Sequence, residues 1–345
     1  IAVRNLQRAN ELITSFKQVA IDQTSVQRRQ FLLAEVVDEI NQKHTVDGAE
    51  INSEIFATQD PEYLCKSCNT IFFMVPSSAF QEVIRSFSPF LYPYHLIIHG
   101  TKGLCLNLPK GKTLEEMGKI NRENILTMSE VIMKETVVVR VGCLAGPNLA
   151  RELYLGQPGA TVVASKYNEV ILEGQRLLRT DKFQVYGNSD IVGVELSGVL
   201  KNIIAIAAGA LAGMGFGENT QAMLITRGLN EVARLCAAHG SDPLSAAGLA
   251  GMGDLVASCG SPLSRNRTFG EALGRTGSMA QAREQVAKTV EGVASAGAVA
   301  EIAHRVGIEV PVIEAVGEIV SEQLTPAAAL QKLMEITTKA ENFIR

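Results

Sequence analysis

One stretch of the sequence constrains the fold more than any other. Residues 193–219 read GVELSGVLKNIIAIAAGALAGMGFGEN, and from Leu196 to Met214 nearly every residue is apolar or small. A helix that is apolar on all sides is a buried helix. Lys201 and Asn202 nevertheless stand near its start. Because a buried lysine is unfavourable unless it is paired or gives up its proton, we expect Lys201 to take part in chemistry.

Two other interpretations of this stretch compete with that one. About 20 apolar residues can span a membrane. The central Lys-Asn pair and the glycines make insertion unfavourable, so no membrane span is predicted. The second alternative is a core helix whose lysine stem carries its ammonium to the surface.

The composition limits the class of protein. With 345 residues the chain is too long for one ordinary core, which predicts two domains. A hydrophobic fraction of 46% and a charged fraction of 20% are typical of a soluble globular protein. The net charge of −4 argues against nucleic acid or anionic membranes as general partners. An anionic substrate would therefore need a local basic pocket.

The six cysteines are scattered along the chain, and Cys65-Lys66-Ser67-Cys68 is the only CxxC sequence. A zinc site of this type needs a second pair, so no metal site is predicted. We interpret the cysteines as free thiols of a reducing compartment, which favours the cytoplasm and leaves an organelle as the alternative.

Apolar runs alternate with helical patterns in the first part of the chain. This alternation predicts a parallel, doubly wound, Rossmann-like α/β sheet, possibly incomplete at its start. From residue 190 onward the pattern is helical throughout. We therefore expect a nucleotide-binding domain over residues 1–188 and an all-helical substrate-binding domain over residues 189–345.

The expected elements can be given by residue range. Strands are expected at residues 71–75, 96–98, 137–141, 161–165 and 183–186, with helices at 6–16, 30–42, 77–86, 114–134 and 168–179. In the helical part, helices are expected at residues 196–214, 219–239, 243–248, 251–259, 265–273, 278–285, 291–306, 311–322 and 325–342.

Three short polar sequences follow expected strands. They are Val75-Pro76-Ser77, Thr101-Lys102-Gly103 and Gly146-Pro147-Asn148. Ligands of doubly wound sheets bind beyond the carboxyl ends of the strands, so these sequences are candidates for binding.

Two polar groups interrupt the helical part. Asp254 lies in Gly251-Met252-Gly253-Asp254-Leu255, where a helix N-cap is the alternative interpretation. Ser264-Arg265-Asn266 is followed by Arg267, and a solvated turn is the alternative there. A guanidinium beside a hydroxyl and an amide also suits phosphate, because its fork matches phosphate oxygens bidentately. Together with Lys201-Asn202 these groups form a specific combination.

A larger set of motifs surrounds these groups. They are Gly193-Val194-Glu195, Leu200-Lys201-Asn202, Asn219-Thr220, Thr226-Arg227-Gly228-Leu229, residues 248–255, Leu263-Ser264-Arg265-Asn266 and Glu291-Gly292-Val293. With Gly146-Pro147-x-x-Ala150 and the other two strand-end sequences, the pattern over residues 52–335 resembles the soluble NAD(P)-dependent glycerol-3-phosphate dehydrogenase family. The resemblance implies an oxidoreductase that interconverts sn-glycerol 3-phosphate and dihydroxyacetone phosphate with NAD or NADP.

The resemblance also implies roles for single residues. Lys201 would be the acid/base for the oxygen of the reacting carbon, and Lys102 and Asp254 would act beside it in catalysis. The implied substrate contacts are Lys102, Gly146, Asn148, Asn202, Ser258, Ser264, Arg265 and Asn266, of which Ser264, Arg265 and Asn266 take the phosphate. The implied cofactor contacts are Arg4, Pro76, Lys102, Ala150, Arg265 and Glu291.

The physics of a lysine base agrees with these roles. Its pKa must lie near the working pH. Apolar surroundings and a second cation, Lys102, both lower the pKa of Lys201. Asn148 departs from the Ser or Thr expected after Gly-Pro, and Ser258 stands where the family often has Thr. The long helical part favours a homodimer.

The sequence lacks the GxGxxG turn with which the family holds the cofactor pyrophosphate. In one explanation, Ile1-Ala2-Val3 is the opening strand and residues 4–9 replace the turn, which gives a catalytically silent structural subunit. In the other, residues 1–11 are the second strand and its helix, and the turn lies upstream of Ile1. Arg4 would then contact the adenosine ribose or its phosphate, and an insertion would fall between residues 14 and 51.

A third interpretation is a dehydrogenase of the same plan that acts on a hydroxy acid. Ser264-Arg265-Asn266 argues against it, because a carboxylate substrate without phosphate does not need that group.

Overall fold

A computed structural model describes residues 58–107, 116, 122–286 and 290–335. The description therefore does not include several sequence-based predictions. The strand and helices expected before residue 57, the contact of Arg4 and the insertion between residues 14 and 51 all lie outside the described residues.

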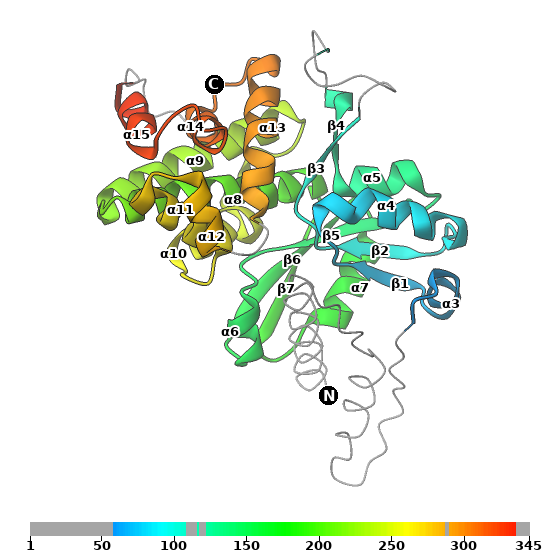
Figure 1. Cartoon of the computed structure of the whole chain (residues 1–345). Coiled ribbons are helices and arrows are strands. Elements are labelled where there is room, and N and C mark those ends of the chain that lie inside the picture. The colour runs from blue at the N-terminus through cyan, green and yellow to red at the C-terminus, as the bar shows by residue number, and fades with distance from the viewer. Residues whose placement is uncertain (1–57, 108–115, 117–121, 287–289, 336–345) are drawn as a thin grey trace.

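The first part of the described chain forms a five-stranded sheet in the order β1-β2-β5-β6-β7, with a separate two-stranded ribbon of β3 and β4 (Figure 1). The strands are β1 (Thr70–Phe73), β2 (Leu96–His99), β3 (Leu104–Leu106), β4 (Ile125–Thr127), β5 (Val141–Ala145), β6 (Gly159–Ser165) and β7 (Phe183–Asn188). The helices of this part are α3 (Pro61–Ser67), α4 (Ser77–Phe87), α5 (Met128–Glu135), α6 (Ala150–Tyr154) and α7 (Asn168–Leu178).

Helices cover both faces of this sheet, as a doubly wound sheet requires. On β2, Ile97 packs with residues of α4 and α5, whereas its neighbour Ile98 packs on the opposite face with Val170 of α7. Successive side chains of a strand point to opposite faces, so both faces of β2 are buried. The strand predicted at 96–98 is confirmed, and it extends by one residue to His99.

The sheet is mixed, and the prediction that all its strands are parallel is wrong. β1, β2 and β5 are mutually parallel, but β6 runs antiparallel to β5 and parallel to β7. The connection from β5 to β6 contains only the five-residue helix α6. Such a helix rises about 7.5 Å, whereas a five-residue strand is about 16 Å long. The chain therefore turns back at the same end of the sheet.

Two further elements differ from the predictions. The strand expected at 137–141 lies instead at Val141–Ala145, where Gly142 is needed because a Cβ there would lie 2.6 Å from a methyl group of Val170. Within the helix expected at 114–134, the described residues form strand β4 and then helix α5. Thr127 ends the strand and begins the helix, because it forms a capping box with Glu130.

The chain after β7 is helical throughout the described residues, with helices near the predicted positions. They are α8 (Ile191–Gly213), α9 (Glu218–Ala238), α10 (Asp254–Gly260), α11 (Arg265–Thr276), α12 (Met279–Gln285), α13 (Glu291–Val306), α14 (Pro311–Val320) and α15 (Pro326–Glu335). A 3₁₀ turn at Pro243–Ala247 and a π turn at Leu249–Gly253 precede α10. Residues 336–342 of the last predicted helix lie outside the described residues.

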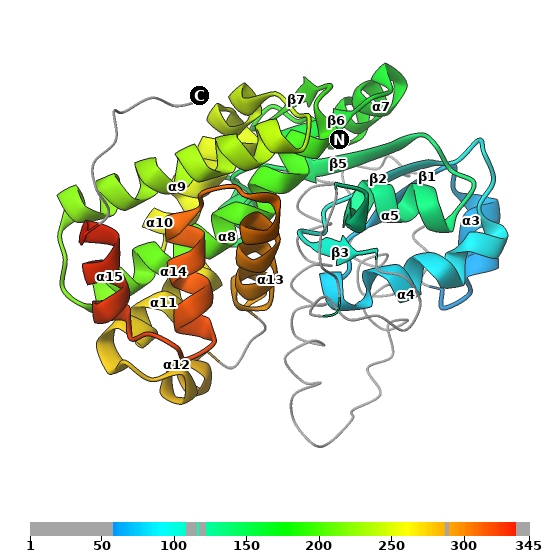
Figure 2. The ribbon, with the colours of Figure 1, turned by 90° about the horizontal axis from the view of Figure 1, so that it is seen from above.

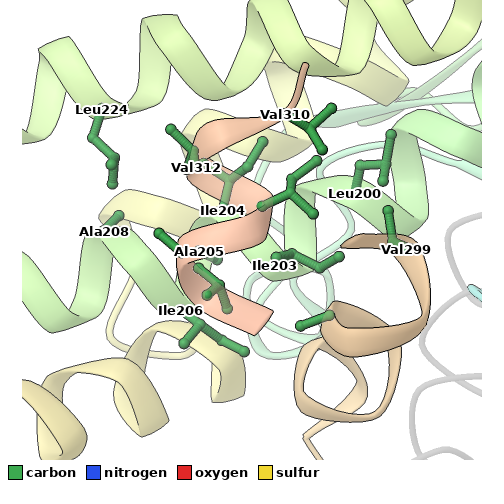
Figure 3. Close-up of a cluster of buried hydrophobic side chains, with 14 of the residues drawn as sticks. Leu200, Ile203, Ile204, Ala205, Ile206, Ala208, Leu224, Val299, Val310 and Val312 are labelled. Atoms are coloured by element: carbon green, nitrogen blue, oxygen red, sulfur yellow. The ribbon is translucent and has the colours of Figure 1, made fainter. Parts of the chain in front are cut away.

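Helix α8 joins the two parts of the molecule (Figure 2). Its first turn packs Ile191 and Val194 against β5 and β6, and its later turns form the centre of the helical core. Figure 3 shows Leu200, Ile203 and Ile204 of this helix among Val299, Val310 and Val312 of neighbouring segments. The helix is long and apolar enough to cross a membrane, but 94% of its most apolar window is buried inside the protein.

Glycines allow α8 and α11 to cross at very short range. A Cβ on Gly209 or Gly213 of α8 would lie 2.1 Å from a backbone oxygen of α11. Conversely, a Cβ on Gly270 or Gly274 of α11 would lie 2.0 or 2.1 Å from a backbone oxygen of α8. The two glycine pairs, each spaced by four residues, form one flat face per helix. This crossing fixes where the N-terminus of α11 lies relative to Lys201.

Candidate active site

Lys201 lies within a cluster of hydrogen-bonding side chains inside the protein. Its Nζ lies 2.6 Å from Oδ1 of Asp254 and 2.6 Å from Oγ of Ser258, both on α10. All three residues are buried. The ammonium therefore does not extend to the surface, and Asp254 is the first residue of α10 rather than its N-cap. The expectation of a paired, buried Lys201 is met.

Lys102 reaches the same carboxylate from the sheet. It follows β2 by three residues, and its Nζ lies 2.6 Å from Oδ2 of Asp254. Its stem crosses α8 at Gly198, where a Cβ would meet Lys102 carbons at 3.8 Å. One carboxylate thus bridges two lysines that come from different parts of the fold.

The surroundings shift the pKa values of the two lysines in opposite directions. Burial, together with the positive charge of Lys102, lowers the pKa of Lys201 to about 8 although Asp254 acts in the opposite direction. For Lys102, the unfavourable effect of burial is outweighed by the charge and hydrogen bond of Asp254, so its pKa is raised. At neutral to mildly alkaline pH, Lys102 remains a cation while Lys201 can exchange its proton.

A chain of amide hydrogen bonds extends the site toward α11 and α13. Asn202 donates from Nδ2 to Oε2 of Glu291 at 3.2 Å and accepts from Nδ2 of Asn266 at 3.0 Å. Oδ1 of Asn266 in turn accepts from the backbone N–H of Gly292 at 2.9 Å. This chain brings together three of the predicted site residues, which come from three helices.

The N-terminus of α11 carries the other predicted phosphate residues. Ser264 is the N-cap, and its hydroxyl accepts from the N–H of Arg267 at 3.3 Å. Arg265 follows as the first helical residue and is exposed, whereas Asn266 is buried beside Asn202. The positive end of a helix and a guanidinium at this point form a suitable receptor for an anion.

Comparisons with known proteins show the family of the chain. Residues 190–331 match the family profile described as the C-terminus of NAD-dependent glycerol-3-phosphate dehydrogenase, and residues 12–171 match the profile of its N-terminus. The glycerol-3-phosphate dehydrogenase (NAD(P)+) of Thermobifida fusca is 39% identical over 315 residues, which cover 90% of this chain and 89% of that protein. The chain belongs to the NAD(P)-dependent glycerol-3-phosphate dehydrogenase family.

Solved structures of the same family share the architecture. The glycerol-3-phosphate dehydrogenase of Coxiella burnetii matches with a TM-score of 0.71 at 34% identity and covers 87% of this chain and 88% of its own. That of Plasmodium falciparum, at 19% identity and with a TM-score of 0.73, shares the fold. The predicted fold class, a Rossmann-like sheet followed by a helical part, is confirmed.

The remaining predicted contacts of this glycerol-3-phosphate dehydrogenase family member lie at strand ends. Pro76 precedes α4 after β1, and Oγ1 of Thr101 donates to the backbone oxygen of Val75 at 2.6 Å, which joins two of the loops. The ring of Pro147 lies 3.8 Å from the position of a Cβ on Gly253, directly before Asp254.

The loop after β5 orders two more of these residues. Gly146 adopts a φ of 148°, a conformation that favours glycine, and a Cβ there would lie 3.1 Å from Cα of Thr161. Asn148 donates from Nδ2 to Oγ1 of Thr161 at 2.9 Å, so its amide is oriented by β6. Ala150 begins α6.

Sequence reasoning missed a second buried polar cluster, formed by His99, Ser129 and Glu195. The sequence signal that could have found it is a charged residue in an apolar helix, the same signal that singled out Lys201. Glu195 also places a charged side chain in the apolar stretch of α8, where a charge is unfavourable without a partner.

Proposed function

We propose that the protein interconverts sn-glycerol 3-phosphate and dihydroxyacetone phosphate with NAD(H) or NADP(H), and that Lys201 is its acid/base. The observation that carries this proposal is the buried Lys201–Asp254–Lys102 cluster, in which the pKa of Lys201 is about 8. Membership of the dehydrogenase family favours this function over a silent structural subunit. Turnover of sn-glycerol 3-phosphate by the full-length protein is the direct test, and its absence with both cofactors would contradict the proposal.

The hydrogen bonds of Lys201 suit an acid/base. A neutral amine has two N–H groups and one lone pair. With the two N–H groups directed to Asp254 and Ser258, the lone pair is left for a third partner. During oxidation it would accept the proton of the substrate C2 hydroxyl, and during reduction the resulting ammonium would return that proton. The cationic Lys102 would stabilise negative charge that develops on the same oxygen.

The cofactor contacts are proposed on the basis of position. Pro76, Lys102 and Ala150 follow the carboxyl ends of β1, β2 and β5, where doubly wound sheets bind nucleotides. Lys102 links this edge to Asp254, so a ligand bound there would lie beside Lys201. A bound nicotinamide supplies the hydride acceptor or donor, and the protein orients it. Glu291 and Arg265 would contribute from the helical side.

The substrate contacts are proposed in the same way. Ser264, Arg265 and Asn266 would bind the phosphate at the N-terminus of α11. Asn202 and Lys102 would hold the substrate oxygens nearer Lys201, with Gly146, Asn148 and Ser258 completing the surroundings. The amide chain through Asn202 supports this arrangement, because it fixes the spacing between Asn266 and the residue next to Lys201.

The division of the chain and its assembly are also proposals. We place the nucleotide-binding domain at residues 1–188 and the helical substrate domain at residues 189–345, since α8 begins at Ile191. We propose a homodimer in the cytoplasm. The six cysteines are free, which suits a reducing compartment, and the exposed side chains of Leu244 and Val256 offer apolar surface. Light scattering of the purified protein measures the oligomeric state.

The pKa of Lys201 predicts opposite pH dependences for the two directions. Oxidation needs the neutral amine, so its kcat/KM should rise with pH through about 8 and then level off. We call this rise the oxidation limb of the pH profile. Reduction needs the ammonium, so its kcat/KM should fall above about 8. In Lys102→Met the loss of the neighbouring positive charge raises the pKa of Lys201, and the oxidation limb should move to higher pH. Initial rates between pH 6 and pH 10 measure both limbs, and parallel profiles in the two directions would contradict the assignment.

Phosphate recognition by Arg265 can be measured by substrate comparison. Arg265→Met should raise KM for sn-glycerol 3-phosphate about 10- to 100-fold, the effect of losing a charge-assisted pair of hydrogen bonds. The rate on unphosphorylated glycerol should stay the same. Arg275→Met is the matched control, because Arg275 lies at the other end of α11 with 59% of its side chain exposed. An equal loss on both substrates would rule out a phosphate role.

A further inference from the structure

A buried polar cluster lies between the sheet and α8, away from Asp254. Nε2 of His99 lies 3.0 Å from Oε1 of Glu195 and 3.1 Å from Oγ of Ser129. The backbone N–H of Ser129 donates to the same Oε1 at 2.9 Å. His99 and Ser129 are each 1% exposed, and Glu195 is 6% exposed. Three elements, β2, α5 and α8, therefore meet at a single carboxylate oxygen.

The cluster has a fixed position relative to the two lysines. His99 is the last residue of β2 and stands three residues before Lys102. Glu195 stands six residues, about 1.7 helical turns, before Lys201 on α8. Gly198 lies midway between them and receives the stem of Lys102. Residues three apart on a helix are neighbours on the same face. The chain leaving β2 therefore follows α8, with His99 against Glu195 and Lys102 against Gly198.

Stability alone does not require this arrangement. Apolar side chains of similar volume usually serve a buried position as well as an ion pair or better. Polar groups that must pair with each other do fix one register, because every other alignment leaves them buried and unpaired. Oε2 of Glu195 and Nδ1 of His99 have no partner among the described residues, so the cluster depends on the contacts at Oε1 and Nε2.

Other groups surround the carboxylate of Glu195. Its Oε1 accepts the N–H of Ser129 in the first turn of α5. Cys143 of β5 faces it, and burial, together with the charge of Glu195, raises the pKa of that thiol well above its ordinary value, so the thiol remains neutral. Phe80 of α4 packs on the other side, and the centroid of its ring lies 5.7 Å from the centroid of the His99 ring.

We propose that the His99–Ser129–Glu195 cluster is a positioning device, which sets the register of β2 against α8 and so holds Lys102 on Asp254. The proposal rests on the role of Lys201 given above, because Lys102 affects the reaction through Asp254 and Lys201. None of the three residues touches the reacting atoms in this account. A shift of Lys102 by about 1 Å would be enough to reduce the rate up to about 100-fold.

Two amide variants of His99 test the proposal. In His99→Gln the Nε2 donor keeps roughly the reach of the imidazole Nε2, whereas the shorter amide of His99→Asn cannot reach Glu195. We expect kcat/KM for oxidation to fall about 10- to 100-fold in His99→Asn and its rising pH limb to move to higher pH. His99→Gln should restore most of the rate and the original limb. The limb reports the pKa of Lys201, which is set by burial, Lys102 and Asp254, while Glu291 of α13 acts on the pKa of Lys102.

His95→Asn is the matched control. His95 is also fully buried, stands directly before the other end of β2, and bonds through Nε2 to the backbone oxygen of Cys65 at 2.8 Å. Its replacement should lower the thermal midpoint without moving the pH limb. The proposal would be overturned if kcat/KM of His99→Asn rose at the same pH as in the wild-type protein. It would also be overturned if the rise in His95→Asn moved to higher pH as far as in His99→Asn.

A second variant keeps the test decisive if His99→Asn does not fold. Glu195→Met keeps roughly the length of the side chain but removes the oxygen that accepts the contacts of Ser129 and His99. The same upward shift of the limb is expected, and an unchanged limb would overturn the proposal. Lys201→Met distinguishes a failure of the positioning role from a failure of the acid/base assignment. If Lys201→Met retains turnover, the acid/base assignment is wrong. If it is inactive and the His99 and Glu195 variants behave like wild type, only the positioning role is wrong.

Discussion

Replacing Lys201 with methionine is expected to reduce turnover at least about 1,000-fold, within the range that a positioned acid/base contributes. Methionine keeps much of the apolar stem but offers no proton. Oxidation then has no group at that point to accept the proton of the substrate hydroxyl, and reduction has none to donate it. Steady-state rates in both directions, with KM measured for each substrate, check the result.

The same substitution should leave the fold intact. Asp254 loses one of its two lysine partners but keeps the hydrogen bond to Lys102 at 2.6 Å, so no buried charge is left alone. The thermal midpoint should therefore change little. Lys332→Met serves as the control, because Lys332 pairs with Glu318 at the surface of the helical part and should affect neither rate nor stability appreciably.

A near-native rate in Lys201→Met would transfer the acid/base role to another group. Lys102 would be the next candidate, as its Nζ touches the same carboxylate. The raised pKa of Lys102 makes it a poorer base at neutral pH. An oxidation limb well above pH 8 in the wild-type protein would favour that alternative.

Much of the fold was predictable because single residues report their surroundings. The uniform apolarity of α8 indicates burial, and a lysine inside it needs a partner, which the structure supplies as Asp254. The run at β2 and its polar end likewise predicted a strand followed by Lys102. These inferences depend on local composition, which the sequence contains directly.

What the sequence did not predict depends on contacts between distant segments. The direction of β6 follows from the length of α6. The run of valines at 137–139 resembles a strand, although Val137 and Val139 are exposed. The partners of Glu195 come from residues 66 and 96 positions away. No local sequence pattern encodes contacts over such distances. The charge of Glu195 in an apolar stretch indicates that it has a buried partner, but it does not identify His99 and Ser129.

Replacing Gly270 with alanine is expected to destabilise the helical part by about 3 kcal/mol, at the upper end of overpacking effects. The added Cβ would lie 2.0 Å from the backbone oxygen of Ile206 and 3.0 Å from the backbone nitrogen of Ala210. Carbon contacts need about 3.5 Å. Because the opposing atoms are backbone, relief requires α11 to move more than about 1 Å away from α8.

That displacement should also reduce activity in protein that remains folded. Asn266 stands in the first turn of α11, and its 3.0 Å contact with Asn202 would break, so KM for the phosphorylated substrate should rise. Thermal melts and KM at a temperature below the transition measure both effects. Gly297→Ala is the matched control, since that helical glycine of α13 has nothing within 4 Å of a Cβ and alanine should stabilise it by about 1 kcal/mol. If Gly270→Ala were as stable as Gly297→Ala, the two helices could separate without loss, and their close crossing would not be what places the phosphate residues beside Lys201.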